Sequence, residues 1–160
     1  MCRIFCLLLA ILFLAGGVSV GPCAAGHLTL QIVRTVGEEL LWESPVERGD
    51  HFTIEYRHSS DLTPVRDLFR IGNEGEIVLI EESYLWYGAG LESHPEMGKT
   101  DFSGEWTRVR MQRAFPRFLL RVGEVANHVL TLHGREIPLL SIARGRESIW
   151  IRVKRNVKIQ

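Results

Sequence analysis

The residues best suited to chemistry lie in one short segment, residues 56–69, with the sequence YRHSSDLTPVRDLF. His58, Ser59 and Asp61 are the residue types of a hydrolytic nucleophile with its base and orienting acid. Neighbouring residues of a strand point to opposite faces of a sheet, so His58 is poorly placed to activate Ser59. The one Gly-x-Ser-x-Gly match, residues 17–21, directly follows the apolar N-terminal run, so it lacks the strand-to-helix turn that forms the nucleophile elbow of many hydrolases. The segment therefore predicts no catalytic residue for acyl transfer.

The same segment could contribute to a metal site, with His58, Asp67, Glu82 and His94 as ligands. However, the sequence has no His-x-His or His-x-x-x-His spacing, the pattern that places two imidazoles beside one ion. We therefore predict neither a metal nor a cofactor. A hydrolase or metal-dependent enzyme that uses His58 with Asp67 or Glu82 remains the alternative.

A hairpin would place these residues relative to one another. If residues 59–62 form a four-residue loop, His58 faces Thr63 across the hairpin, and Glu55 faces Arg66 as a favourable opposite-charge pair. The other face then carries His58, Thr63 and Asp67 inward among apolar residues, because side chains alternate along a strand. Its pairs are Tyr56 with Val65, Ile54 with Asp67, and Phe52 with Phe69. Pro64 lacks a backbone donor, which favours an edge strand or a bulge at this point.

A second polar group follows in the next strand-like run. Glu82 and Tyr84 precede a turn of Gly88, Ala89 and Gly90, whose small residues permit close approach of a ligand or another chain. We predict a binding site made of residues from both groups. Its members are His58, Thr63, Asp67, Glu82, Tyr84, Gly88, Ala89 and Gly90. The alternative is a polar cluster that fixes strand register through its own hydrogen bonds, and we expect His58→Ala to separate the two by weakening binding without unfolding the domain.

The segments around these residues have the pattern of strands. Short runs rich in β-branched and aromatic residues are separated by glycine-containing turns, and no segment keeps a helical period over three turns. The sequence predicts a single all-β domain, an antiparallel sandwich or barrel of about eight or nine strands. Residues 92–104 are predicted to be a loop. The strand-like runs are residues 28–32, 52–57, 77–80, 84–87, 108–112, 118–122, 129–132, 137–140 and 149–153.

The N-terminus has the pattern of a targeting segment. A short basic start is followed by an uninterrupted apolar run over residues 4–15, then by helix-breaking and small residues up to Ala25. This order is typical of a cleaved signal peptide. We predict a signal peptide over residues 1–25 and the β domain over residues 26–160. An uncleaved membrane anchor and lipidation at Cys23 are the alternatives. Cleavage would remove all 3 cysteines, so disulfides and thiol chemistry are not expected in the domain.

Charge excludes one class of partner. The chain has 19 basic and 19 acidic residues, whereas nucleic-acid binding usually needs a clustered basic surface. A basic group near the C-terminus alternates with apolar residues, which predicts the solvent face of a last strand. We therefore predict no nucleic-acid partner.

Several of these motifs together resemble a bacterial domain-of-unknown-function family. They are His58-Ser59, Thr63-Pro64-Val65, the acid Asp67, Phe69, Glu82, Tyr84, Gly88-Ala89-Gly90-Leu91, Leu120-Arg121-Val122-Gly123 and His128. The sequence departs from the family pattern at Asp67, where glutamate is more usual, and at Glu92, where a proline is expected. The resemblance implies a small exported protein encoded beside TRAP transporters of the TAXI type. It implies no reaction.

From these observations we expect a non-enzymatic accessory of a TAXI-type TRAP solute transporter. We place it in the periplasm or on the outer face of the inner membrane. Its expected partners are the transporter permease, the solute receptor or a small solute. Besides the enzyme named above, an envelope interaction protein unrelated to transport is the second alternative.

Overall fold

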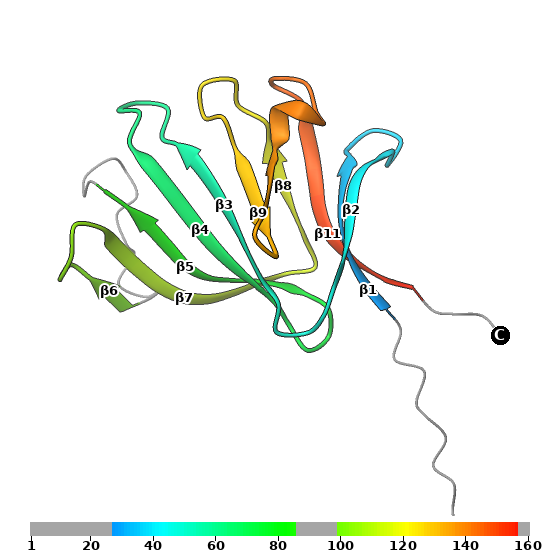
Figure 1. The fold of residues 1–160 in the computed structure, drawn as a ribbon, viewed down its shortest axis with the longest axis horizontal. Coiled ribbons are helices and arrows are strands. Elements are labelled where there is room, and N and C mark those ends of the chain that lie inside the picture. The colour runs from blue at the N-terminus through cyan, green and yellow to red at the C-terminus, as the bar shows by residue number, and fades with distance from the viewer. Residues whose placement is uncertain (1–26, 86–98, 157–160) are drawn as a thin grey trace, which may run out of the picture.

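The computed structural model describes residues 27–85 and 99–156 of the chain. These residues form two antiparallel sheets and contain no α-helix, which confirms the predicted all-β class (Figure 1). They also contain no helix long and apolar enough to cross a membrane. The strands are β1 His27–Arg34, β2 Leu40–Val46, β3 His51–Arg57, β4 Pro64–Ile71, β5 Ile77–Tyr84, β6 Lys99–Asp101, β7 Thr107–Phe115, β8 Arg117–Arg121, β9 Val129–Leu132, β10 Arg135–Pro138 and β11 Ser148–Asn156; a 3₁₀ helix, η1, spans Leu139–Ser141.

The two sheets differ in size and meet face to face. The smaller has the strand order β2-β1-β11-β8, and the larger has the order β10-β9-β3-β4-β5-β7-β6. The chain passes from the larger to the smaller sheet between β7 and β8, which are separated by Pro116 alone. This corner brings the end of β7 and all of β8 close to the inner face of β4 and β5, where two of the predicted site residues lie.

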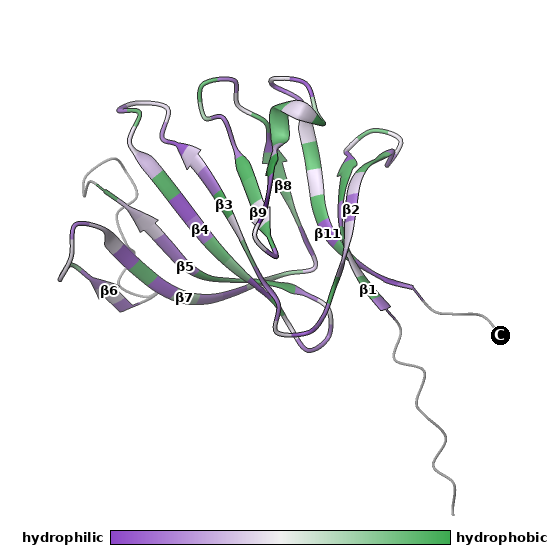
Figure 2. Cartoon of the chain, in the orientation of Figure 1, coloured by the Kyte–Doolittle hydropathy of each residue, from purple (hydrophilic) through white to green (hydrophobic). Residues whose placement is uncertain are grey.

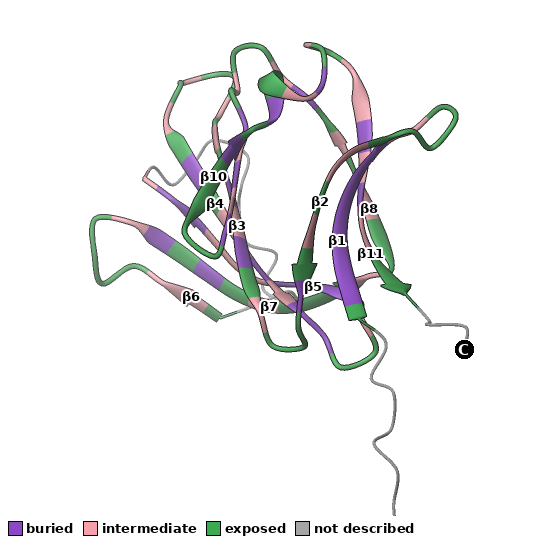
Figure 3. Ribbon diagram, turned by 45° about the vertical axis from the view of Figure 1, so that its right-hand side comes forward, coloured by how far each residue is buried: buried purple, intermediate pink, exposed green. Residues whose placement is uncertain are grey.

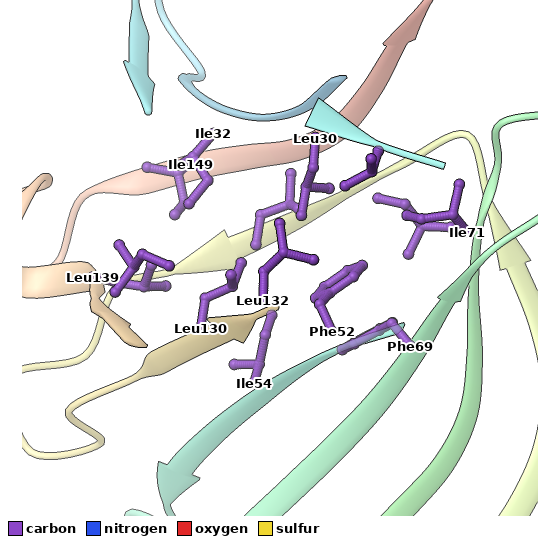
Figure 4. Close-up of a cluster of buried hydrophobic side chains, with 14 of the residues drawn as sticks. Leu30, Ile32, Phe52, Ile54, Phe69, Ile71, Leu130, Leu132, Leu139 and Ile149 are labelled. Atoms are coloured by element: carbon purple, nitrogen blue, oxygen red, sulfur yellow. The ribbon is translucent and has the colours of Figure 1, made fainter. Parts of the chain in front are cut away.

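Alternating apolar residues of both sheets build the core. Figure 2 shows hydrophobic and hydrophilic residues alternating along the strands of the larger sheet, and Figure 3 shows β1 buried along most of its length. Figure 4 shows Phe52 and Phe69 on one side of the core, with Leu30 and Ile32 of the smaller sheet on the other. The rings of Phe52 and Phe69 stack with centroids 4.9 Å apart, and Phe69 stacks on Phe118 of β8 at 5.1 Å. This aromatic stack joins the two sheets.

The predicted hairpin register is confirmed. Strands β3 and β4 pair Phe52 with Phe69, Ile54 with Asp67, and Tyr56 with Val65. On the outer face, Glu55 and Arg66 form an ion pair with 2.9 Å between Oε1 and Nε. The backbone amide of His58 donates a 2.8 Å hydrogen bond to the carbonyl of Thr63, which closes the loop as expected.

Three local predictions are corrected. The described residues contain eleven strands rather than eight or nine, because β2 lacks apolar alternation and β6 lies in the segment predicted to be a loop. The run over residues 137–140 ends as a strand at Pro138 and continues as η1, which buries Leu139. Pro64 does not lie on an edge strand, since β4 pairs with both β3 and β5. As the first residue of β4, Pro64 has no ladder partner on β5, so its missing donor costs no hydrogen bond there.

Candidate functional site

The turn between β3 and β4 holds a small network of polar side chains. Asp61 accepts hydrogen bonds at Oδ1 from the amide and the hydroxyl of Thr63, at 3.0 Å and 2.7 Å. These bonds lower the pKa of Asp61. The same oxygen lies 3.4 Å from Nδ1 of His58, and Ser60 Oγ lies 2.9 Å from that nitrogen. Leu62 adopts a positive φ of 61° within the turn, so the network holds a strained backbone.

The network is unsuited to nucleophilic catalysis. In a Ser-His-Asp triad the serine and the aspartate bind different ring nitrogens, so that one can relay a proton while the other holds the tautomer. Here Ser60 and Asp61 both approach Nδ1 of His58. Ser59, the serine beside His58 in sequence, has no part in these contacts. The geometry is that of an Asx-type turn.

His58→Ala is therefore expected to act on the turn. We expect the free energy of unfolding to fall by no more than about 1 kcal/mol, because one partly exposed hydrogen bond is lost. Urea denaturation measures this loss. Isothermal titration calorimetry should show unchanged solute binding in the cavity that Asp67 and Glu82 line between the two sheets. A tenfold loss of affinity would contradict this placement and return His58 to the binding site.

Asp67 and Glu82 are brought together by the sheet. They are direct cross-strand partners on β4 and β5, as are Val65 and Tyr84 at the next position of the same face. Both carboxyls line a cavity of about 430 Å³ between the two sheets. Ligand cavities are commonly about 300–1,000 Å³, so this space is large enough for a small organic molecule.

The cavity has an apolar wall and a polar wall. Aromatic and aliphatic residues of β4, β5, β7 and β8 form the first: Phe69, Leu79, Phe115, Phe118, Leu119 and Leu120. Tyr56, Asp67, Glu82 and His128 form the second, with Arg113 and Arg121 also lining the cavity. Leu119 is 55% exposed, so the cavity opens to solvent along β8. Ile54 completes the lining.

Burial perturbs the ionisation of the carboxyl pair. Burial, reinforced by the neighbouring Glu82 carboxylate, raises the pKa of Asp67 to about 7. Burial also raises the pKa of Glu82, while the charge of Arg113 partly offsets this rise. Oδ1 of Asp67 is buried without a hydrogen-bond partner among the described residues. An unpaired buried acceptor is costly, so this atom is the part of the site that most needs a ligand.

Tyr56 and His128 were not among the predicted site residues. Their rings lie 5.3 Å apart, and burial together with the charges of Asp67 and Glu82 raises the pKa of Tyr56, so its hydroxyl stays protonated. His128 lies directly before β9 and is only 9% exposed. The amide of Gly123 donates to its Nδ1 at 3.3 Å, which leaves the proton on Nε2. Burial lowers the pKa of His128 and keeps the ring neutral.

The predicted site residues thus fall into separate places. Asp67 and Glu82 share the cavity, His58 and Thr63 belong to the turn, and Tyr84 is 1% exposed in a packed cluster with Val65 and Val109. Gly88, Ala89, Gly90 and His94 lie outside the described residues. Within the residues that the structure describes, no group of three or more His, Cys, Asp or Glu side chains could hold a metal ion.

Comparison with known proteins gives one match. A family model described as "Domain of unknown function (DUF1850)" matches residues 52–139. The match spans β3 to the start of η1 and therefore includes each residue that lines the cavity. No curated protein and no solved structure matches the chain.

Proposed function

The chain belongs to the DUF1850 family of domains of unknown function, and we propose that it is an exported, non-enzymatic solute-binding accessory of a TAXI-type TRAP transporter. The carrying observation is the cavity between the sheets, where the buried Oδ1 of Asp67 has no partner among the described residues. Family membership agrees with the resemblance seen in the sequence. The transport context follows from that resemblance and forms part of the proposal.

Solute binding is supported by the construction of the cavity. Its inner wall is built on adjacent strands β3, β4 and β5, whose register fixes the side chains of Tyr56, Asp67 and Glu82. Sites on strands are held more rigidly than sites on loops. A ligand that donates to Asp67 would remove the cost of its buried, unpaired oxygen. The cavity is thus a pre-formed site in which a bound donor would pair the buried Oδ1 of Asp67.

A non-enzymatic role is supported by the separation of the polar groups. His58, which the enzyme alternative would use with Asp67 or Glu82, lies in the turn network, whereas the two carboxyls line the cavity. The imidazole that lines the cavity with the two carboxyls is that of His128, whose Nδ1 already accepts a hydrogen bond from the amide of Gly123. A rival enzyme would have to use Asp67 as a general acid, because its pKa of about 7 suits proton donation near neutral pH. Chemical conversion of the solute distinguishes the enzyme from the solute-binding accessory.

The test is a binding screen of the purified domain against amines, carboxylates, sugars and neutral solutes. We expect at least one solute to raise the melting temperature and to be recovered chemically unchanged. Glu82→Gln should weaken its binding at least about tenfold, the effect of losing one charge-assisted hydrogen bond. The control His58→Ala, which alters the turn alone, should bind normally. Conversion of the solute would favour the enzyme, and no binding across the screen would contradict a solute-binding role.

Co-purification of the full-length chain from native membranes completes this test. Recovery of a TRAP permease or its solute receptor supports the transport role. Consistent recovery of other envelope components would instead favour the envelope interaction protein. Fractionation of the same cells shows whether the chain reaches the periplasm.

A further inference from the structure

Neither Asp67 nor Glu82 forms an ion pair among the described residues. Arg113 lowers the pKa of Glu82 by its charge, but no cationic side chain of the described residues has this effect on Asp67. The Asp67 carboxyl is buried, faces another carboxyl and keeps Oδ1 free of hydrogen bonds among the described residues. A pair of carboxyls with one member unneutralised favours a cationic donor from outside the chain.

We propose that the cavity binds a protonated amine attached to an apolar group, with the ammonium between Asp67 and Glu82. This inference rests on the solute-binding role proposed above and names the class of solute. An ammonium supplies three N–H donors and one positive charge in a compact group. It would satisfy Oδ1 of Asp67 and reduce the repulsion between the two carboxyls at once.

Groups from every element around the cavity favour this orientation. Tyr56 on β3 is a neutral phenol and His128, before β9, is a neutral imidazole, so neither places a positive charge at the polar wall. Arg113 and Arg121, on β7 and β8, are both exposed, and the Arg113 guanidinium lies 5.0 Å from the ring centroid of Phe115. Of the two carboxyls, only Glu82 is affected by the Arg113 charge, so the ammonium is drawn toward Asp67.

The aromatic wall accounts for the apolar part of the ligand. Phe69, Phe115 and Phe118 line the cavity from three strands, and Phe118 stacks on Phe69 and packs against Phe115 at 6.0 Å. Burial of an apolar group against these rings is favourable because it removes apolar surface from water. Aromatic faces near an ammonium add cation–π attraction. A carboxylate placed at the same end would instead face two carboxyls and be repelled.

The experiment compares two molecules that differ in the charged group alone. Phenethylamine carries an ammonium and 3-phenylpropanoate carries a carboxylate on similar apolar bodies. Calorimetric titration of the purified full-length protein should show binding of phenethylamine and none of 3-phenylpropanoate. Because Asp67 must ionise to pair with the ammonium, the affinity for phenethylamine should rise roughly tenfold between about pH 6 and about pH 8, as expected for a pKa of about 7.

Variants assign this binding to the cavity. Asp67→Asn should weaken phenethylamine binding at least tenfold at about pH 8 and remove the pH dependence. Glu82→Gln should also weaken phenethylamine binding, as a second and independent test. Asp61→Asn is the matched control, since it makes the same change in the turn, and it should bind as the unaltered chain does.

The outcomes separate the two proposals. Binding of 3-phenylpropanoate without phenethylamine, or failure of phenethylamine when the screen finds another solute, overturns the amine assignment and leaves solute binding intact. Failure of both probes and of the whole screen overturns both proposals. Phenethylamine binding that Asp67→Asn and Glu82→Gln leave unchanged would place the amine elsewhere and also overturn this inference.

Discussion

Asp67→Asn is expected to stabilise the domain at about pH 8, raising the free energy of unfolding by about 2 kcal/mol. The pKa of Asp67 rises from 3.8 to about 7 on folding, which corresponds to about 4 kcal/mol against the charged form. Asparagine keeps the shape but still buries an amide that needs partners, so only part of this penalty is recovered.

The sign of the pH dependence follows from proton binding. Between about pH 4 and about pH 7 the folded chain holds a proton on Asp67 that the unfolded chain has released, so stability falls as pH rises through this window. The raised pKa of Glu82 acts in the same direction. The partly exposed acids with lowered pKa values, Asp61 and Asp101 among them, act with the opposite sign at lower pH, where they gain protons.

Urea denaturation of both proteins at about pH 5 and about pH 8 checks this expectation, since linear extrapolation resolves differences of this size. The variant should gain at about pH 8 and gain little at about pH 5. Asp61→Asn, the same substitution in the turn, should show no gain at about pH 8. An equal difference between variant and parent at both pH values would show that Asp67 is not the titrating group.

Phe69→Ala is expected to lower the free energy of unfolding by about 3–5 kcal/mol, the usual cost of removing a buried phenyl ring. Phe69 is 4% exposed and stacks between Phe52 of the same sheet and Phe118 of the other. Its loss would remove apolar burial and the aromatic contacts that join the sheets. It would also enlarge the cavity beside Asp67, so any solute that packs on this wall should bind more weakly.

Chemical denaturation gives the stability and calorimetry gives the affinity for this variant. Leu119→Ala is the control, because Leu119 also lines the cavity but is 55% exposed. It should cost less than about 0.5 kcal/mol, as exposed substitutions usually do. A loss below about 1 kcal/mol for Phe69→Ala would contradict the role of the stack in joining the sheets.

Amine binding at Asp67 should depend on pH. Near neutral pH, a fraction of the Asp67 carboxyls is protonated, because the pKa of this group is about 7. Binding of an ammonium to ionised Asp67 therefore releases a proton from this carboxyl to solvent. Solute release would then be favoured in a more acidic compartment. The pH series with phenethylamine measures this coupling directly.

Local pattern was sufficient for the hairpin that carries Asp67. The alternation of apolar residues and the charges of Glu55 and Arg66 predicted the register that β3 and β4 adopt. A one-residue slip would turn every side chain to the other face, so pattern and register determine each other. The pairing of Asp67 with Glu82 was harder to predict from the sequence, because the register between β4 and β5 is irregular.

The all-β class, the hairpin of β3 and β4 and the family of this chain could all be predicted from the sequence. These depend on residues close together in sequence, where alternation and turn residues act directly. The separation of His58 in the turn from Asp67 and Glu82, which line a cavity with Phe118 and His128, could not be predicted before the sheets were placed. Those contacts join separate strands of two sheets. They depend on how the sheets pack, which the alternation of residues within one strand does not specify.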